Sequence, residues 1–309
     1  MALSKLSGDE QGVIFIQLCN ALEPRLAVYF SSASHELWEL TQALRQQLRA
    51  DHEAAAALCH KVERCCSTEL GGELRSCKEL RETTVIEWVH QGLSAAELAL
   101  LGRLGSVLPA LERLVLLDFS GVAGPEGVQQ LAAGLGKGAL PAVTFLQIVS
   151  IQLGDAGASE LAAALGRGAL PRLKSLYLYA NAIVDADLVA LALALRRLPA
   201  LETLALSDNP LGDEGLAALV APPPPAGALP PPAGVLTKLQ RLDLRHTQIT
   251  DAGCAALVAA LDSGALPALE TLDLRDTPAS AVAKAAVHQA RDNLLVQESG
   301  SEESDSEDE

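Results

Sequence analysis

The sequence is poor in aromatic residues, methionine and positive charge, and each shortage narrows what the protein can be. Only 3% of its 309 residues are aromatic and one is methionine, whereas leucine and alanine abound, as is typical of repetitive chains. The 23 Lys and Arg stand against 39 Asp and Glu, and the formal charge of −16 disfavours binding to nucleic acid or to an acidic membrane surface. No apolar run approaches the ~18 residues of a membrane span.

The amino-terminal region also lacks the pattern of a secretory signal. Asp9 and Glu10 fall where a signal peptide has its apolar run. The cysteines lack the paired spacing of a secreted disulfide scaffold and occupy positions 19, 59, 65, 66, 77 and 254. The group from Cys59 to Cys77 leaves two alternatives, zinc ligands or free thiols, and adjacent cysteines on a helix diverge in a way that disfavours zinc. We expect a cytoplasmic or nuclear protein with reduced thiols and no metal.

A repeated phrase organises the chain from residue 108 onward. LPALERL begins at residue 108, and similar phrases begin at residues 140, 170, 198, 236 and 266. Between equivalent positions, starting at Leu111, the intervals are 32, 30, 28, 38 and 30 residues. The phrases continue as Leu-x-Leu, as in Leu176 and Leu178, which predicts a short strand with alternate leucines in the core.

The second half of each unit has a helical pattern. Asp155, Asp213 and Asp251 stand where an N-cap carboxylate accepts hydrogen bonds from free backbone N–H groups. Apolar residues then follow at three- and four-residue spacing, and glycines occur where the helices should end. A strand and a helix every ~30 residues predict an α/β fold, a curved solenoid with parallel strands on the concave face and helices on the convex face.

These long units resemble the ribonuclease-inhibitor-like class of leucine-rich repeats, which also occurs in NLR receptors and in Ran GTPase-activating proteins. The resemblance covers about residues 108–296. We divide the chain into a helical segment (1–75), a degenerate capping repeat (76–107), six leucine-rich repeats (108–297) and a disordered acidic tail (298–309). In the capping repeat, Ser94 and Glu97 have the spacing of a capping box.

Two segments depart from the repeat pattern. The proline-rich stretch 221–235 should loop out between a helix and the next strand. It is either a tolerated insertion or a polyproline ligand for an SH3 or WW partner. The acidic tail holds seven carboxylates and no basic residue, and Ser299, Ser304 and Ser306 have the pattern of acidophilic kinase sites.

The helical segment resembles an F-box over residues 6–40. The positions expected to contact an adaptor are Leu6, Ile14, Leu18, Leu22, Pro24 and Leu26. The resemblance implies docking on a Skp-type adaptor, which joins such proteins to a cullin-based ubiquitin ligase; Ser7 replaces the usual proline. The alternative is a helical cap on the solenoid, in which these apolar residues are core.

The concave face is the predicted partner-binding surface, because strand residues that flank the buried leucines must point outward there. Its middle units offer aromatic and apolar side chains and its last units offer charge. The candidate binding residues are Phe145, Gln147, Tyr177, Tyr179, Arg241, Asp243, Arg245, Asp273 and Arg275. Tyrosine, phenylalanine and arginine are the anchors that protein interfaces favour, and a merely solvated face is the alternative.

No catalytic or cofactor-binding set is recognisable. The six histidines are scattered, and GLGKGA at 134–139 lacks the spacing of a Walker loop. We therefore predict a monomeric, non-enzymatic module that captures a protein partner, and the F-box resemblance implies a substrate receptor of a ubiquitin ligase. The alternatives are a GTPase-activating protein of the Ran type, which would bind a small GTPase, and a plain interaction scaffold.

Overall fold

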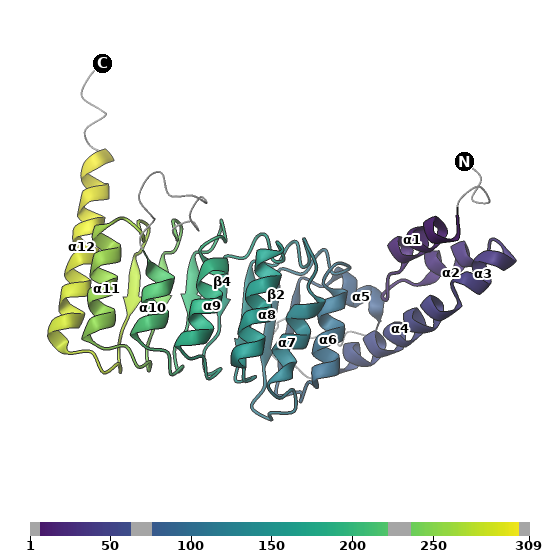
Figure 1. Cartoon of the computed structure of the whole chain (residues 1–309), viewed down its shortest axis with the longest axis horizontal. Coiled ribbons are helices and arrows are strands. Elements are labelled where there is room, and N and C mark those ends of the chain that lie inside the picture. The colour runs from purple at the N-terminus through teal and green to yellow at the C-terminus, as the bar shows by residue number, and fades with distance from the viewer. Residues whose placement is uncertain (1–6, 63–75, 222–235, 303–309) are drawn as a thin grey trace, which may run out of the picture.

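The computed structural model describes residues 7–62, 76–221 and 236–302. These residues form an elongated row of strand–helix units, with an arm of helices at the amino-terminal end and a long helix at the other end (Figure 1). The described part of the chain holds one parallel sheet whose seven strands follow chain order: β1 Val85–Val89, β2 Arg113–Leu117, β3 Phe145–Val149, β4 Ser175–Tyr177, β5 Thr203–Ala205, β6 Arg241–Asp243 and β7 Thr271–Asp273.

A layer of helices covers one face of this sheet. Each helix follows its strand in the chain and packs beside the helix of the next unit, as expected for a solenoid. The layer consists of α6 Ala95–Leu104, α7 Glu126–Gly134, α8 Gly154–Gly166, α9 Asp185–Leu195, α10 Asp213–Val220, α11 Asp251–Asp262 and α12 Ala281–Glu302. The predicted fold class, an α/β leucine-rich-repeat solenoid with a helical amino-terminal part, is confirmed.

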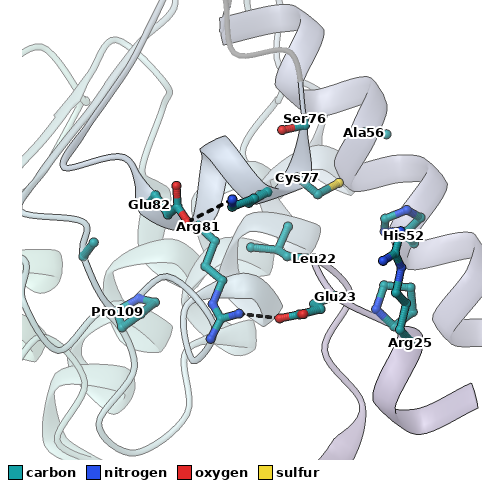
Figure 2. Close-up of a pocket in the computed structure, with 13 residues that line it drawn as sticks. Leu22, Glu23, Arg25, His52, Ala56, Ser76, Cys77, Arg81, Glu82 and Pro109 are labelled. Carbon is teal, nitrogen blue, oxygen red and sulfur yellow. Dashed lines mark hydrogen bonds and ion pairs between the residues drawn. The ribbon is translucent and has the colours of Figure 1, made fainter. Parts of the chain in front are cut away.

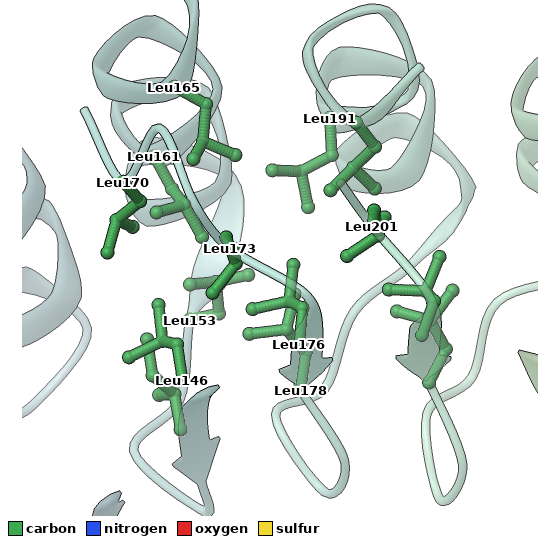
Figure 3. Packing of buried hydrophobic residues seen from close by; sticks show 14 of the residues in the cluster. Leu146, Leu153, Leu161, Leu165, Leu170, Leu173, Leu176, Leu178, Leu191 and Leu201 are labelled. Atoms are coloured by element: carbon green, nitrogen blue, oxygen red, sulfur yellow. The ribbon is translucent and has the colours of Figure 1, made fainter. Parts of the chain in front are cut away.

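A column of apolar residues fixes the register of the sheet. Equivalent residues pair strand to strand, so Leu146 lies beside Leu176 and Leu176 beside Leu204. Leu176 and Leu178 have no exposed surface and point toward the leucines of the helices and turns (Figure 3). Each leucine packs on the same position of the next unit, which places the core between the two layers.

Strand β1 is more regular than its sequence suggests. It pairs with β2 over five residues, from Val85 with Arg113 to Val89 with Leu117. Ile86 and Trp88 stand at the leucine positions and are buried. The capping box before α6 is confirmed, since Ser94 Oγ accepts from Glu97 N and the Glu97 carboxylate accepts from Ser94 N. The predicted capping repeat therefore contains a regular strand and helix.

The aspartates at the helix starts act on a different helix from the one we predicted. Asp213 is the first residue of α10, and its carboxylate accepts hydrogen bonds from Thr250 N (2.8 Å) and Gly253 N (2.9 Å) at the start of α11. Asp251 likewise accepts from Ser280 N (2.6 Å), before α12. The prediction that these carboxylates cap their own helices is wrong. Because each lies inside the first turn, it reaches the next helix in the stack instead.

The amino-terminal helices form an arm with two anchoring regions. They are α1 Gly8–Leu18, α2 Arg25–Ser31, α3 His35–Leu40, α4 Gln42–Val62 and α5 Cys77–Glu82. Phe15, Ala27 and Leu48 make a small core where α1 and α2 meet the outer part of α4. Leu58, with Leu22 of the α1–α2 turn, joins the main core beside β1. Helix α4 thus ties the arm to the solenoid.

Several predictions fall outside the described residues. They concern Leu6, Cys65, Cys66, most of the proline-rich stretch and residues 303–309. Helix α12 continues to Glu302, so it enters the segment that we expected to be disordered from residue 298. None of the helices described is long and apolar enough to cross a bilayer.

Candidate protein-binding face

Aromatic side chains of β3, of β4 and of the turn after β4 form a continuous row on the concave face. The ring centroids of Phe145 and Tyr177 are 5.0 Å apart, and those of Tyr177 and Tyr179 are 6.4 Å apart at a right angle. The Arg113 guanidinium carbon lies 3.7 Å from the centre of the Phe145 ring. All four side chains are half-buried, so their free faces remain open to a partner.

Polar contacts hold this row in place. The Gln147 amide donates a 2.5 Å hydrogen bond to Tyr179 Oη, and Arg113 Nε lies 3.2 Å from Glu87 Oε1 on β1. Burial raises the pKa of Tyr179, so its hydroxyl keeps its proton and stays available as a donor. Rings fixed by neighbours lose little side-chain entropy when a partner binds, which favours this row as an anchor.

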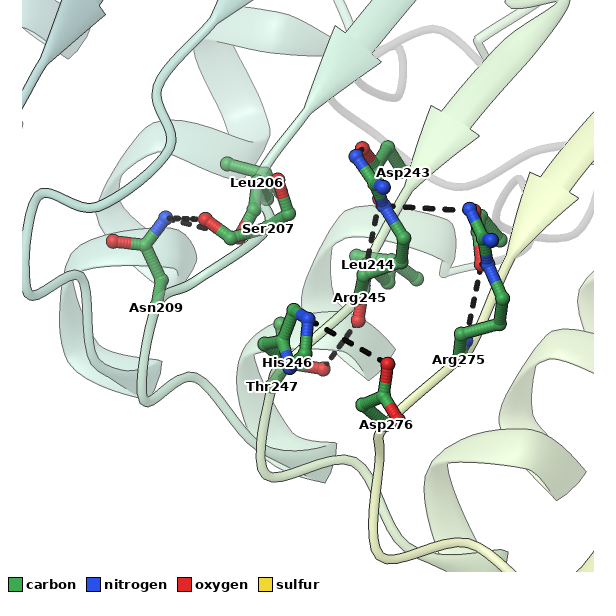
Figure 4. A network of polar contacts seen from close by, with 11 residues as sticks. Leu206, Ser207, Asn209, Asp243, Leu244, Arg245, His246, Thr247, Arg275 and Asp276 are labelled. Carbon is green, nitrogen blue, oxygen red and sulfur yellow. Dashed lines mark hydrogen bonds and ion pairs between the residues drawn. The ribbon is translucent and has the colours of Figure 1, made fainter.

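Charged residues at the ends of β6 and β7 and just after them pair with one another (Figure 4). Arg245 lies 2.7 Å from Asp243 and 3.5 Å from Asp273, while Arg275 Nη2 lies 2.6 Å from Asp273 Oδ2. The hydrogen bond from Arg275 holds the pKa of Asp273 below its usual range, and the bond to Asp243 raises the pKa of Arg245. A partner therefore meets a network that is already neutral, because each of these charges faces an opposite one.

The structure brings the predicted concave residues onto one surface, but only some of them are open to contact with a partner. Phe145, Tyr177 and Tyr179 offer ring faces, whereas Asp243, Arg245, Asp273 and Arg275 are engaged with each other. Arg241 is exposed on β6, and no ion pair joins it to a described residue.

Sequence reasoning missed an aromatic pair at the rim of this face. Phe119, 65% exposed, stacks on His90 with ring centroids 5.0 Å apart, and exposed Val122 follows in the same turn. Phe119 stands where later units have Asn181 and Asn209. The sequence signal that could have revealed this pair is a phenylalanine at the position where other units have the loop asparagine.

Asn181 and Asn209 themselves are structural, as their position in the repeat predicts. Asn209 Oδ1 accepts from Asn181 N (2.9 Å) and Ile183 N (3.0 Å). Its Nδ2 donates to backbone carbonyls of the same turn, including Ser207 (Figure 4), and to Leu178 in the unit before. Both asparagines are buried and join consecutive turns.

The predicted adaptor-binding residues are distributed between core and surface. Leu22 is 5% exposed and packs in the main core, and Leu18 packs against the small core of the arm. Ile14 and Pro24 are half-buried, whereas Leu26 is 59% exposed. Other apolar side chains of α2 and α3 are also exposed: Tyr29, Trp38 and Leu40.

A cavity of about 970 Å³ lies where the arm meets the solenoid (Figure 2). Arg81 Nη1 of α5 lies 2.6 Å from Glu23 Oε2 across it, and Cys77 and His52 line it. Burial raises the pKa of Cys59 to about 12 and also raises that of Cys77, so both thiols stay protonated at neutral pH. Within the described residues no group of three or more His, Cys, Asp or Glu side chains could hold a metal ion.

One comparison with known proteins places a match on the repeats. A family model described as leucine-rich repeat matches residues 198–220 and 235–258. No curated protein matches the chain. Among solved structures, the chain is similar to actin-binding site 2 of leiomodin-1, with 14% identity and a TM-score of 0.39 over 58% of this chain and 94% of that one. It is also similar to an internalin of Listeria monocytogenes, with 12% identity and a TM-score of 0.25 over 77% and 92%.

The repeat match and the seven-stranded parallel sheet show that the chain contains leucine-rich repeats within an α/β solenoid. The matched residues span β5 and α10, then β6 and part of α11. The concave face of those strands is thus part of a recognised repeat.

Proposed function

We propose that this protein is a non-enzymatic interaction module, built from repeats of the ribonuclease-inhibitor-like class, that captures a protein partner on its concave face. The observation that carries the proposal is the fixed, half-exposed row of Phe145, Tyr177 and Tyr179. Buried aromatic anchors supply most of the binding energy in protein interfaces. The neutral Asp–Arg network, which strand β5 separates from the aromatic row, serves as a polar border. The module acts in the cytoplasm or nucleus.

Affinity purification with quantitative mass spectrometry tests this function. The full chain is compared with a Phe145→Ser, Tyr177→Ser double variant. A Val189→Ser, Leu193→Ser variant is the matched control, because it removes exposed apolar side chains from α9 on the opposite face. We expect the concave variant to lose its main partner at least tenfold, as two lost anchors imply. Equal recovery by both variants would contradict the concave-face assignment.

A second candidate function is that of a ubiquitin-ligase substrate receptor. Exposed Leu26 and Tyr29 on α2, with Leu40 on α3, support an adaptor-docking role for the F-box-like segment. The discriminating variant is Leu26→Glu with Tyr29→Glu, since a charge at Leu18, which packs against the small core, would disrupt the arm itself. A Skp-type adaptor and a cullin should copurify with the full chain and disappear from this variant and from a chain without residues 1–40. If neither is recovered with the full chain, the arm is a cap of the solenoid.

The Ran-type GTPase activator and the plain scaffold remain as alternatives. The repeat class and the acidic tail support the activator, and exposed Arg241 is the concave arginine left for a GTPase after Arg245 and Arg275 pair with aspartates. Stimulated GTP hydrolysis by a copurified small GTPase, lost on Arg241→Ala, would establish it. A stable partner with neither adaptor nor GTPase would leave the scaffold.

A further inference from the structure

A groove of about 670 Å³ lies between α2, α3 and α4, away from the concave strands. Val28 of α2 and Trp38 of α3 form one wall, and polar residues of α4 form the other. Trp38 is 46% exposed and Val28 39% exposed, so the apolar wall is open.

The opposite wall carries the positive charges of two arginines. Arg45, Arg49 and His52 follow one another at four- and three-residue spacing and therefore lie on one face of α4. No ion pair joins Arg45 or Arg49 to a carboxylate of a described residue. Glu39 is the acidic residue that lines the groove, and His35 lies 3.7 Å from it. In a chain of charge −16, this lining is an exception.

The two walls meet at Trp38. The Arg45 guanidinium carbon lies 3.3 Å from the centre of the Trp38 ring, which fixes both side chains. A cation over an indole face leaves the other indole face for an apolar side chain. The His52 ring donates from Nδ1 to Ala21 O (2.6 Å), which orients the imidazole at the end of the groove.

We propose that this groove binds an acidic amphipathic segment of a partner protein, with an apolar side chain against Trp38 and Val28 and carboxylates against Arg45 and Arg49. Charge complementarity carries the choice of occupant, since the local cations attract carboxylates at contact distance while the acidic remainder repels extended polyanions. Arginine is also suited to carboxylates, because its planar donors match both oxygens. The groove is a second binding surface, separate from the proposed concave one.

Fluorescence titration of the full chain tests the proposal. The probe is the synthetic peptide Asp-Glu-Leu-Phe-Glu-Asp-Leu-Glu, with blocked ends. Trp38 reports its binding, because the second tryptophan, Trp88, is 1% exposed. We expect a saturable change in emission, at least tenfold weaker after Arg45→Glu with Arg49→Glu, and severalfold weaker when the peptide's Leu and Phe are replaced by Ser.

Matched controls separate this site from general charge effects. Lys137→Glu with Arg172→Glu changes the net charge equally at exposed sites in the solenoid turns and should leave the affinity within twofold. Phe145→Ser with Tyr177→Ser should also leave the affinity for the peptide unchanged. A negative result for the groove is therefore distinct from a negative result for the concave face. The proposal is overturned if no peptide binds, if both charge variants lose binding equally, or if a Lys-for-Glu/Asp peptide binds as well. If a peptide of this chain's own residues 298–309 binds more tightly than the synthetic peptide, the proposal is overturned, and the occupant of the groove is the tail of a second copy of the chain.

Discussion

At the residue scale, the side chains of two buried asparagines hydrogen-bond to the backbone of consecutive turns, and Asn209 makes more of these hydrogen bonds than Asn181. Its amide serves two backbone N–H groups and three backbone carbonyls. Asn209→Ala would leave these buried groups unpaired, and we expect a loss of about 3 kcal/mol in the free energy of unfolding, measured by urea denaturation. Asn209→Thr should recover part of it, because Thr247 Oγ1 donates to Leu244 O (2.8 Å) at the same position of the next unit. Equal losses in both variants would contradict this role.

A buried carboxyl makes the stability of α9 depend on pH. Asp187 is 2% exposed and lies beside Asp155, and burial with this neighbouring carboxyl raises the pKa of Asp187. The folded protein therefore holds the proton of the Asp187 carboxyl more tightly than the unfolded chain does. This protonation contributes fully to the free energy of unfolding at acid pH. It is lost as pH rises through the raised pKa.

Asp187→Asn should remove this dependence while the side-chain oxygen still accepts from Val184 N. We expect the variant to be more stable than the parent at pH 7 and no more stable below pH 4, by thermal denaturation across pH. Parallel pH profiles for parent and variant would contradict the prediction that the folded protein holds the Asp187 proton more tightly than the unfolded chain.

Two glycines set the distance between elements α6 and α7. A Cβ built on Gly102 would collide with Leu131 O, and one on Gly134 would lie 2.8 Å from Arg103 N. The helix backbones thus touch where these glycines face each other. Gly102→Ala should cost about 3 kcal/mol by forcing the helices apart.

Gly166→Ala is the matched control for that substitution. It lies in the last turn of α8, where a Cβ meets no atom within 4 Å. The change should be neutral or stabilise by up to about 1 kcal/mol, because alanine is the better helix former. Similar urea midpoints for the two alanine variants would contradict the close packing of α6 on α7.

How far the elements can be read from the sequence depends on the range of the interactions involved. The Leu-x-Leu strands and the capping box of Ser94 and Glu97 are local patterns, and both were predicted. Strand β1 looked degenerate only because Ile86 and Trp88 replace leucines, which the core accepts equally. The role of Asp213 was missed, since the sequence does not show that its carboxylate is closer to α11 than to its own helix end.

The candidate sites show the same limit. Alignment of the repeats predicted that Tyr177 and Asp273 lie on the concave face. It did not predict that Asp273 forms an ion pair with Arg275. In the arm, spacing could not separate exposed Leu26 from buried Leu22, because that difference arises when the turn before α2 packs onto the solenoid.

The whole molecule is a one-dimensional array, so damage at one end should stay local. Leu58 of α4 is 1% exposed and packs the arm onto the end of the sheet at β1. Leu58→Ala should remove about 3 kcal/mol of local stability. Hydrogen exchange should accelerate for amides of α4 and β1 and stay unchanged for β6, because each unit contacts only its neighbours. Uniform acceleration across all strands would indicate a single cooperative unit instead.

The carboxylates that reach from one helix start to the next also determine where the chain tolerates a change in length. The core leucine that directly follows a strand is separated by seven positions from the first aspartate of the next helix in successive units, as from Leu206 to Asp213 and from Leu244 to Asp251. One residue more or fewer would move Asp213 away from Thr250 and Gly253. The segment that leads from a helix to the next strand varies in length from unit to unit, and the proline-rich stretch 221–235 lies in one of these segments, between α10 and β6. That side of the solenoid is where a foreign sequence can be grafted without changing the phase of the repeats.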